Sequence, residues 1–103
     1  MAADGLWMST SYGEDSVALH FTWRQQPEAV AQLLVPLEQA LAPFGARPHW
    51  GKVFAAGAAS IAPRYERHAD FVSLVARLDP RGAFRNRWLE RSVLGAPGNP
   101  PAA

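Results

Sequence analysis

The sequence of 103 residues contains no cysteine and only one lysine. Without cysteine the chain has no disulfide framework, no thiolate zinc site and no thiol nucleophile. That composition is compatible with the cytoplasm, where we expect the protein to be located. A net charge of +1 gives no electrostatic footprint for nucleic-acid binding. No apolar run approaches the roughly 20 residues of a membrane span, and the N-terminus lacks the basic and apolar regions of a secretory signal.

The single lysine is Lys52, which lies in the tetrapeptide His49-Trp50-Gly51-Lys52. All other side chains with a fixed positive charge are arginines. A lysine in such a chain suggests a site that needs a compact ammonium group, which differs from the planar guanidinium in shape and hydrogen bonding. Taken alone, a chance surface lysine is the simpler interpretation.

Two short segments near the N-terminus predict a β-hairpin. Residues 6–12 are predicted as a short strand, and a turn begins at Gly13. Residues 16–23 alternate between apolar and polar side chains, as in a strand with one buried face. The apolar face consists of Val17, Leu19, Phe21 and Trp23. The polar face, with His20 and Thr22, carries no lysine, arginine or glutamate, which favours the lining of a pocket.

A helix is predicted over residues 27–43. Pro27 suits the first helical position, where its missing N–H costs nothing. Pro36 is expected to kink the helix, and Gly45 to end it. The apolar stripe of the helix is predicted to pack on the hairpin. The resulting core would contain Leu19, Phe21, Leu33, Leu34, Leu37 and Leu41.

Downstream of Gly45 the pattern predicts an extended stretch at residues 46–54, a short helical piece at 58–65, a second main helix at 66–78 and a final helical turn within 82–94. Asp79-Pro80 ends the second main helix. Residues 95–103 are expected to form a disordered tail because they are rich in proline. The predicted fold class is therefore α+β, with an antiparallel hairpin and a further short strand packed against two main helices.

The residues alone point to one candidate polar pocket, built from His20, Thr22 and Lys52. A buried histidine beside a solvent-facing threonine is the simpler interpretation of the strand pair. A metal triad of His20, His49 and His68 is rejected because the spacing matches no compact metal motif. The sequence contains neither a glycine-rich phosphate loop nor an arguable Ser-His-Asp arrangement.

Three strings of residues, in this order and spacing, resemble a known family. They are His20-Phe21-Thr22-Trp23, Pro48-His49-Trp50-Gly51-Lys52 and Asp79-Pro80-Arg81-Gly82-Ala83-Phe84-Arg85-Asn86. Over nearly its whole length, from residue 2 to about residue 94, the chain resembles the C-terminal part of the D-arabinono-1,4-lactone oxidases and alditol (xylitol) oxidases. These are FAD-linked oxidases of the vanillyl-alcohol oxidase type. The His-Phe-Thr-Trp string brings the chain closer to the alditol oxidases.

The resemblance implies an FAD-dependent oxidoreductase that oxidises the CH–OH group of a sugar alcohol or an aldono-1,4-lactone. A hydride passes to the flavin, and oxygen is the acceptor. The family implies that Lys52 is catalytic and that His20, Thr22 and Lys52 bind substrate. It also implies that His49, Trp50 and Lys52 contact the cofactor, and it implies no metal.

The main FAD-binding domain of that family is absent from the sequence. We therefore expect residues 1–94 to be a fragment of the substrate domain that is inactive in isolation. The N-terminal flavin-binding domain would be missing or on another chain. The alternative interpretation is a small, non-catalytic α+β module that binds or interacts with a partner.

Overall fold

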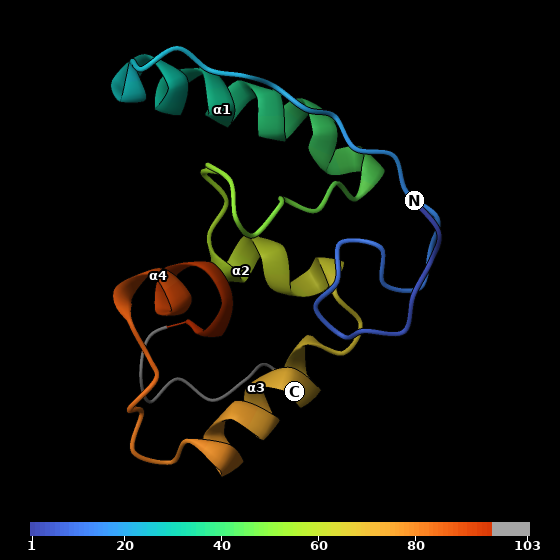
Figure 1. The fold of residues 1–103 in the computed structure, drawn as a ribbon, viewed down its shortest axis with the longest axis vertical. Helices are drawn as coiled ribbons and strands as arrows, with labels where there is room; N and C mark the ends of the chain where they lie inside the picture. Colours follow the sequence, from blue (N-terminus) through green and yellow to red (C-terminus); the bar gives the residue numbers. More distant parts are fainter. Residues whose placement is uncertain (96–103) are drawn as a thin grey trace.

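The computed structural model describes residues 1–95, and Figure 1 shows helices joined by irregular segments. The α-helices of this part are α1 (Pro27–Leu41), α2 (Ala58–Ile61), α3 (His68–Leu78) and α4 (Arg87–Leu89). Short 3₁₀ turns follow α1 and α2 at Ala42–Phe44 and Ala62–Arg64, and a π-helical turn follows α4 at Glu90–Leu94. The tail predicted for residues 95–103 lies, apart from Gly95, outside the described residues.

Helix α1 confirms the first predicted helix. Pro27 occupies its first turn, where the proline ring fixes a helical φ. Pro36 lies inside α1 without ending it. The chain leaves the helix through a 3₁₀ turn that is capped by Gly45, whose φ of 67° is a left-handed conformation that glycine adopts without strain.

Helix α3 confirms the second main helix, and the Asp79-Pro80 pair marks its end. The Asp79 carboxylate accepts hydrogen bonds from the backbone N–H groups of Ala83 and Phe84, at 2.8 and 3.0 Å. An aspartate that bonds to nearby backbone in this way favours a turn over a continuing helix. The chain therefore reverses directly after α3 and leads into α4.

The predicted antiparallel hairpin is wrong, because residues 1–95 contain no strand. The one ladder contact in this part is an isolated parallel bridge between Asp4 and Tyr12. Residues 6–12 instead fold into turns, in which the N–H of Ser9 bonds to Leu6 O and the N–H of Tyr12 bonds to Ser9 O, both at 3.0 Å. The Asp4 carboxylate also accepts bonds from Leu6 N and Ser9 Oγ. Such local bonds compete with the formation of a strand.

The alternating segment of residues 16–23 runs along α1 instead of pairing with a neighbouring strand (Figure 1). No backbone hydrogen bond joins residues 17–23 to any described part of the chain. Alternation selects a face, but a strand also needs a neighbouring backbone to satisfy its N–H and C=O groups. The third strand, predicted at residues 46–54, is replaced by an irregular segment with a turn. The α+β class is thus incorrect for the described chain, which is helical.

The core lies around α2, between the segment that precedes this helix and the C-terminal turn. Phe54, Ile61 and Tyr65 form a buried cluster, and Met8, Trp50 and Ala56 pack against it. Val93 and Leu94, in the turn that contacts α2, are also buried. In Figure 1, α2 occupies the centre, with α1 above it and α3 below.

The core predicted between the hairpin and α1 is not formed. Leu34 is buried, but Leu19 and Leu33 are 63% and 51% exposed. The physical reason is the missing hairpin, since the stripe of α1 has no sheet to cover it. Helix α1 is instead joined to the central segment by Glu38, whose carboxylate accepts bonds from the N–H groups of Ala55 and Ala56 at 2.6 and 2.9 Å.

Candidate functional site

The Lys52 turn, which we define as residues 49–52, carries the motif that the sequence singled out. The Lys52 N–H donates to His49 O at 3.1 Å, and the Gly51 N–H donates to His49 Nδ1 at 3.0 Å. A Cβ on Gly51 would lie 3.3 Å from the His49 ring, so glycine permits this close approach. Because Nδ1 accepts a hydrogen bond, the neutral ring carries its proton on Nε2.

The side chain of Lys52 is exposed, and in the described part of the chain its ammonium forms neither an ion pair nor a hydrogen bond. His49 is exposed as well. The turn therefore presents a free cation and an imidazole to solvent. Two such groups can contact an electron-rich ring or the hydroxyls of a substrate.

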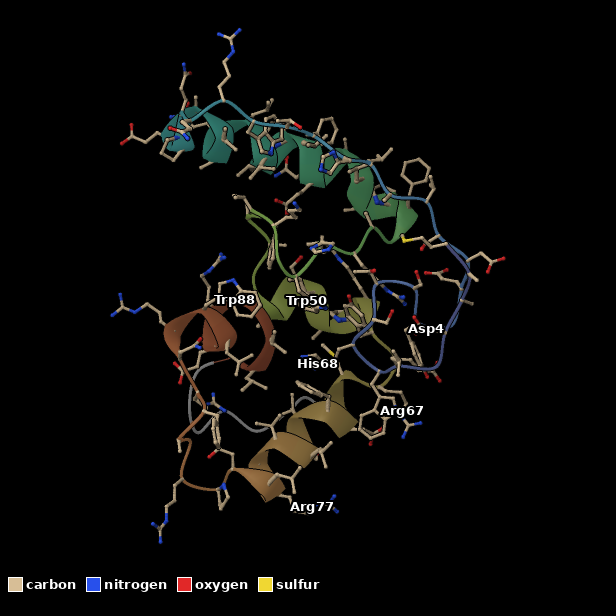
Figure 2. All side chains as sticks on the ribbon, viewed as in Figure 1. Asp4, Trp50, Arg67, His68, Arg77 and Trp88 are labelled. Atoms are coloured by element: carbon tan, nitrogen blue, oxygen red, sulfur yellow. The ribbon has the colours of Figure 1, made fainter. Side chains whose placement is uncertain are left out.

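Aromatic side chains hold both ends of the Lys52 turn. Trp50 stacks on Tyr65 with ring centroids 5.7 Å apart, and its Nε1–H donates to Met8 O at 2.7 Å. Phe54, two residues beyond Lys52, is 8% exposed and meets Trp50 edge to face at 6.1 Å. Trp88 of α4 completes the group at 6.2 Å from Trp50, and Figure 2 shows the two indoles side by side. Rings in these geometries stabilise one another beyond their burial.

The Tyr65 hydroxyl lies inside this aromatic cluster without a hydrogen-bond partner among the described residues. Burial raises the pKa of Tyr65 above its ordinary value, while the positive charges of Arg47 and Arg64 act in the opposite direction. Burial disfavours the phenolate because a charge is poorly solvated there. Tyr65 is therefore a neutral packing group rather than a base.

His20 and Thr22, the predicted substrate-binding residues, are exposed on the segment beside α1. Figure 1 shows that segment along the upper side of α1 and the Lys52 turn on the lower side, so the helix lies between them. The structure thus brings His49, Trp50 and Lys52 together but does not bring His20 and Thr22 to them. Their roles remain predictions.

His68, the third histidine, has a structural contact. Its Nε2 lies 2.7 Å from Val93 O and ties the start of α3 to the C-terminal turn. Among residues 1–95 no cluster of three histidine, aspartate or glutamate side chains is placed to hold a metal ion.

Sequence reasoning missed Arg47, whose guanidinium contacts both the N-terminal segment and Tyr65. Nε donates to Arg64 O at 2.9 Å, and Nη1 donates to Tyr12 O at 2.8 Å. The guanidinium carbon lies 4.7 Å from the centroid of the Tyr65 ring. The one signal in the sequence was its position directly before the Pro-His-Trp-Gly-Lys string. That position does not reveal its hydrogen-bond partners, because they are distant in sequence.

The Lys52 turn could contact one part of a flavin, but it does not form a binding site for the whole cofactor. A free ammonium suits an electron-rich ring system. A flavin dinucleotide also needs an enclosing site for its pyrophosphate and adenine. Two hollows have volumes of about 520 and 400 Å³. The first is lined by residues 1–2 and 15–17 and the second by residues 26–29, so neither is lined by His49, Trp50 or Lys52. Both hollows are open to solvent.

Most of the chain is similar to known proteins. The family model for D-arabinono-1,4-lactone oxidase matches residues 1–92. The chain is 51% identical over 89 residues to the alditol oxidase of a Streptomyces species, which covers 86% of this chain and 21% of that protein. It is 33% identical over 96 residues to L-gulono-1,4-lactone dehydrogenase of Mycobacterium tuberculosis, covering 91% of this chain and 22% of that protein.

A third relative is the long-chain alcohol oxidase of an uncultured marine euryarchaeote, 34% identical over 87 residues, which cover 79% of this chain and 18% of the relative. The chain thus spans about a fifth of the length of the curated relatives it matches. Within the described residues, no helix has both the length and the apolar character needed to cross a membrane.

Proposed function

Because the chain belongs to the D-arabinono-1,4-lactone oxidase family, whose members are FAD-dependent oxidoreductases, we propose that it forms the substrate-side segment of such an enzyme. The reaction is oxidation of a CH–OH group in a sugar alcohol or an aldono-1,4-lactone. The domain that binds most of the FAD lies outside this sequence and belongs to the same longer polypeptide or to another chain. Residues 1–94 alone do not catalyse the reaction.

The observation that carries this proposal is the Lys52 turn. Its ammonium is exposed and free of ion pairs within the described chain, while Trp50 and Phe54 hold the backbone on either side. A positive charge beside a reacting centre stabilises the negative charge that develops there. Lys52 is therefore the residue to which we assign the catalytic role, and its ammonium would contact the reacting hydroxyl and the cofactor.

The bound FAD supplies the acceptor for the hydride that leaves the substrate carbon, and oxygen then takes the electrons. Trp50 and His49 would contact the cofactor beside Lys52. Trp50 offers a ring that is held in place by Met8 O, and His49 offers an Nε2–H donor. These residues account for one edge of the cofactor only.

His20 and Thr22 bind substrate hydroxyls in this proposal, which requires the segment of residues 17–23 to approach the Lys52 turn. No backbone hydrogen bond within the described chain fixes that segment. Imidazole and hydroxyl groups suit a polyol because each can both donate and accept hydrogen bonds. The longer polypeptide would supply the contacts that bring the segment into place.

The test is a hybrid enzyme in which this chain replaces the matching segment of the Streptomyces alditol oxidase. Reduction of the flavin by xylitol, or by L-gulono-1,4-lactone, is followed without oxygen. The Lys52→Met variant should reduce flavin about 10²–10³-fold more slowly than the parent hybrid. Lys52→Arg should not restore the rate, because the guanidinium differs in shape and reach.

The matched control is Arg77→Met, which removes an exposed cation from α3, away from the Lys52 turn (Figure 2). It should leave the rate unchanged. If both Lys52 variants reduced flavin at rates within about threefold of the parent, Lys52 would have no catalytic role. A parent hybrid that binds flavin but reduces it with neither substrate would instead favour the non-catalytic binding module. In a separate arm, the chain alone should not retain stoichiometric FAD on a desalting column.

A further inference from the structure

We propose that Arg47 is a positioning residue for Lys52. Its guanidinium fixes the approach to the Lys52 turn before substrate or cofactor binds. The inference rests on the proposed function, since it concerns the same turn. It adds a residue that acts through Lys52 without touching the reacting atoms.

Arg47 joins two parts of the chain that are far apart in sequence. On one side, Nη1 donates to Tyr12 O at 2.8 Å and to Thr10 O at 3.4 Å. On the other side, Nε donates to Arg64 O at 2.9 Å. The side chain is only 10% exposed, so these bonds form largely out of water. Two donors in one fixed plane are a property of the guanidinium that an ammonium cannot reproduce.

Two further contacts complete the surroundings of the guanidinium. Its face covers the Tyr65 ring at 4.7 Å from the centroid, and Tyr65 in turn stacks on Trp50. Nη2 also lies 3.7 Å from Glu14 Oε1, but Glu14 is 65% exposed and such a pair contributes little. The carbonyl bonds and the ring contact therefore hold Arg47 in place.

The link from Arg47 to Lys52 is short and is held at several points. Pro48 fixes its own φ and restricts the backbone of Arg47 to extended conformations. Two residues later, Trp50 is bonded to Met8 O, so the same N-terminal segment holds the chain at a second point. Lys52 follows after a turn closed by its own N–H on His49 O. A displaced Arg47 would therefore move the backbone that carries the ammonium.

The alternative is that Arg47 only stabilises the fold. Substitution of a purely structural residue would change the amount of folded, flavin-loaded protein. It would not change the rate of flavin reduction expressed per bound flavin. A positioning residue would lower the rate per bound flavin, because an error of about 1 Å at a reacting group can cost on the order of 10²-fold. Its effect would also vanish once Lys52 is absent, because it acts through Lys52.

The experiment is a double-mutant cycle in the hybrid enzyme, with xylitol as the reductant and all rates expressed per bound flavin. Arg47→Met and Arg47→Lys should each lower the limiting rate of flavin reduction by about 10²-fold. In the Lys52→Met background, Arg47→Met should slow the reaction by less than about threefold more. Arg77→Met is the control for loss of an arginine charge.

Normal rates per flavin for Arg47→Lys and Arg47→Met, in a hybrid where Lys52→Met is slow, would overturn the inference and leave the proposed function intact. The inference would also be overturned if the rate reductions of Arg47→Met and Lys52→Met multiplied in the double variant. Failure of the proposed function gives a different result: neither xylitol nor L-gulono-1,4-lactone then reduces the flavin of the parent hybrid.

A second measurement uses the chain alone and does not depend on activity. The amides of Gly51 and Lys52 are hydrogen-bonded to His49. Their hydrogen exchange should become at least about tenfold faster in both Arg47 variants, while α3 amides keep their protection. Arg77→Met should not change the exchange of these two amides. Unchanged exchange in the Arg47 variants would show that Arg47 does not hold the turn.

Discussion

Residues 50–65 and residues 17–44 are similarly rich in apolar side chains, but the first region buries Phe54, Ile61 and Tyr65, whereas the second buries only Leu34. Phe54 is 8% exposed and Ile61 is fully buried, whereas Phe21 and Phe44 are 48% and 84% exposed. The first region folds back on itself through a short helix and meets the C-terminal turn. The second has only α1 and an extended segment beside it. An apolar pattern therefore specifies which face should be buried, but burial requires a partner within reach.

The largest expected effect that tests this contrast is truncation of Ile61. Ile61 has no exposed surface, so Ile61→Ala should lower the free energy of unfolding by about 2–5 kcal/mol, through lost burial and the cavity left behind. The midpoint of urea unfolding measures the change. The matched variant in the open region is Leu19→Ala, at a side chain that is 63% exposed.

Leu19→Ala should change the free energy of unfolding by no more than about 0.5 kcal/mol, as is usual for surface substitutions. Equal losses for Ile61→Ala and Leu19→Ala would break the comparison, because they would mean that residues 17–23 are buried in solution.

A smaller effect is expected from Tyr65→Phe. This change removes a buried hydroxyl that has no hydrogen-bond partner among residues 1–95. Such a group carries a desolvation cost, so its removal should leave the free energy of unfolding unchanged or raise it by up to about 1 kcal/mol. A loss of more than about 1 kcal/mol would show that the hydroxyl is bonded in solution.

The same side chain predicts a dependence on alkaline pH. Burial raises the pKa of Tyr65 in the folded state, and the unfolded tyrosine ionises at about pH 10. The contribution of this tyrosine to stability is thus complete below about pH 10 and is lost as the pH rises through the folded pKa. Urea unfolding across this range should show the loss in the parent and in Tyr12→Phe, and a smaller loss in Tyr65→Phe.

The elements that could be predicted from the sequence are those whose signals are local. Pro27 marked the first turn of α1, Gly45 its exit, and Asp79-Pro80 the end of α3. Each signal acts through the backbone of its own neighbourhood, so no distant partner is needed. The short helical piece at residues 58–65 was likewise found, as α2 and the 3₁₀ turn after it.

The features that could not be predicted depend on contacts between distant residues. Alternation in residues 16–23 predicted a strand, but a ladder needs a second backbone, and the segment at residues 6–12 forms turns around Asp4 instead. The role of Arg47 was hidden for the same reason. Its partners are the carbonyls of Tyr12 and Arg64, which only the fold brings together.

For the candidate site, too, the part that depends on contiguous residues could be predicted, and the part that depends on distant residues could not. The string at residues 48–52 identified the turn and its cation because those residues are contiguous. The pocket that would join His20 and Thr22 to Lys52 spans the two regions of the molecule, and the described chain holds the two halves apart on opposite sides of α1. The family resemblance supplied these roles, and no contact among residues 1–95 assembles the pocket.

The most direct test of this account is the hydrogen exchange of the backbone amides of residues 17–23, compared between the chain alone and the hybrid enzyme. In the chain alone these amides should exchange at nearly the rate of an unstructured peptide, since they have no backbone hydrogen-bond partner in the described part of the chain. In the hybrid they should be slowed by at least about tenfold, because the longer polypeptide then contacts the segment. Amides in residues 17–23 that are as protected as those of α3 in the chain alone, or that exchange equally fast in both proteins, would contradict the account.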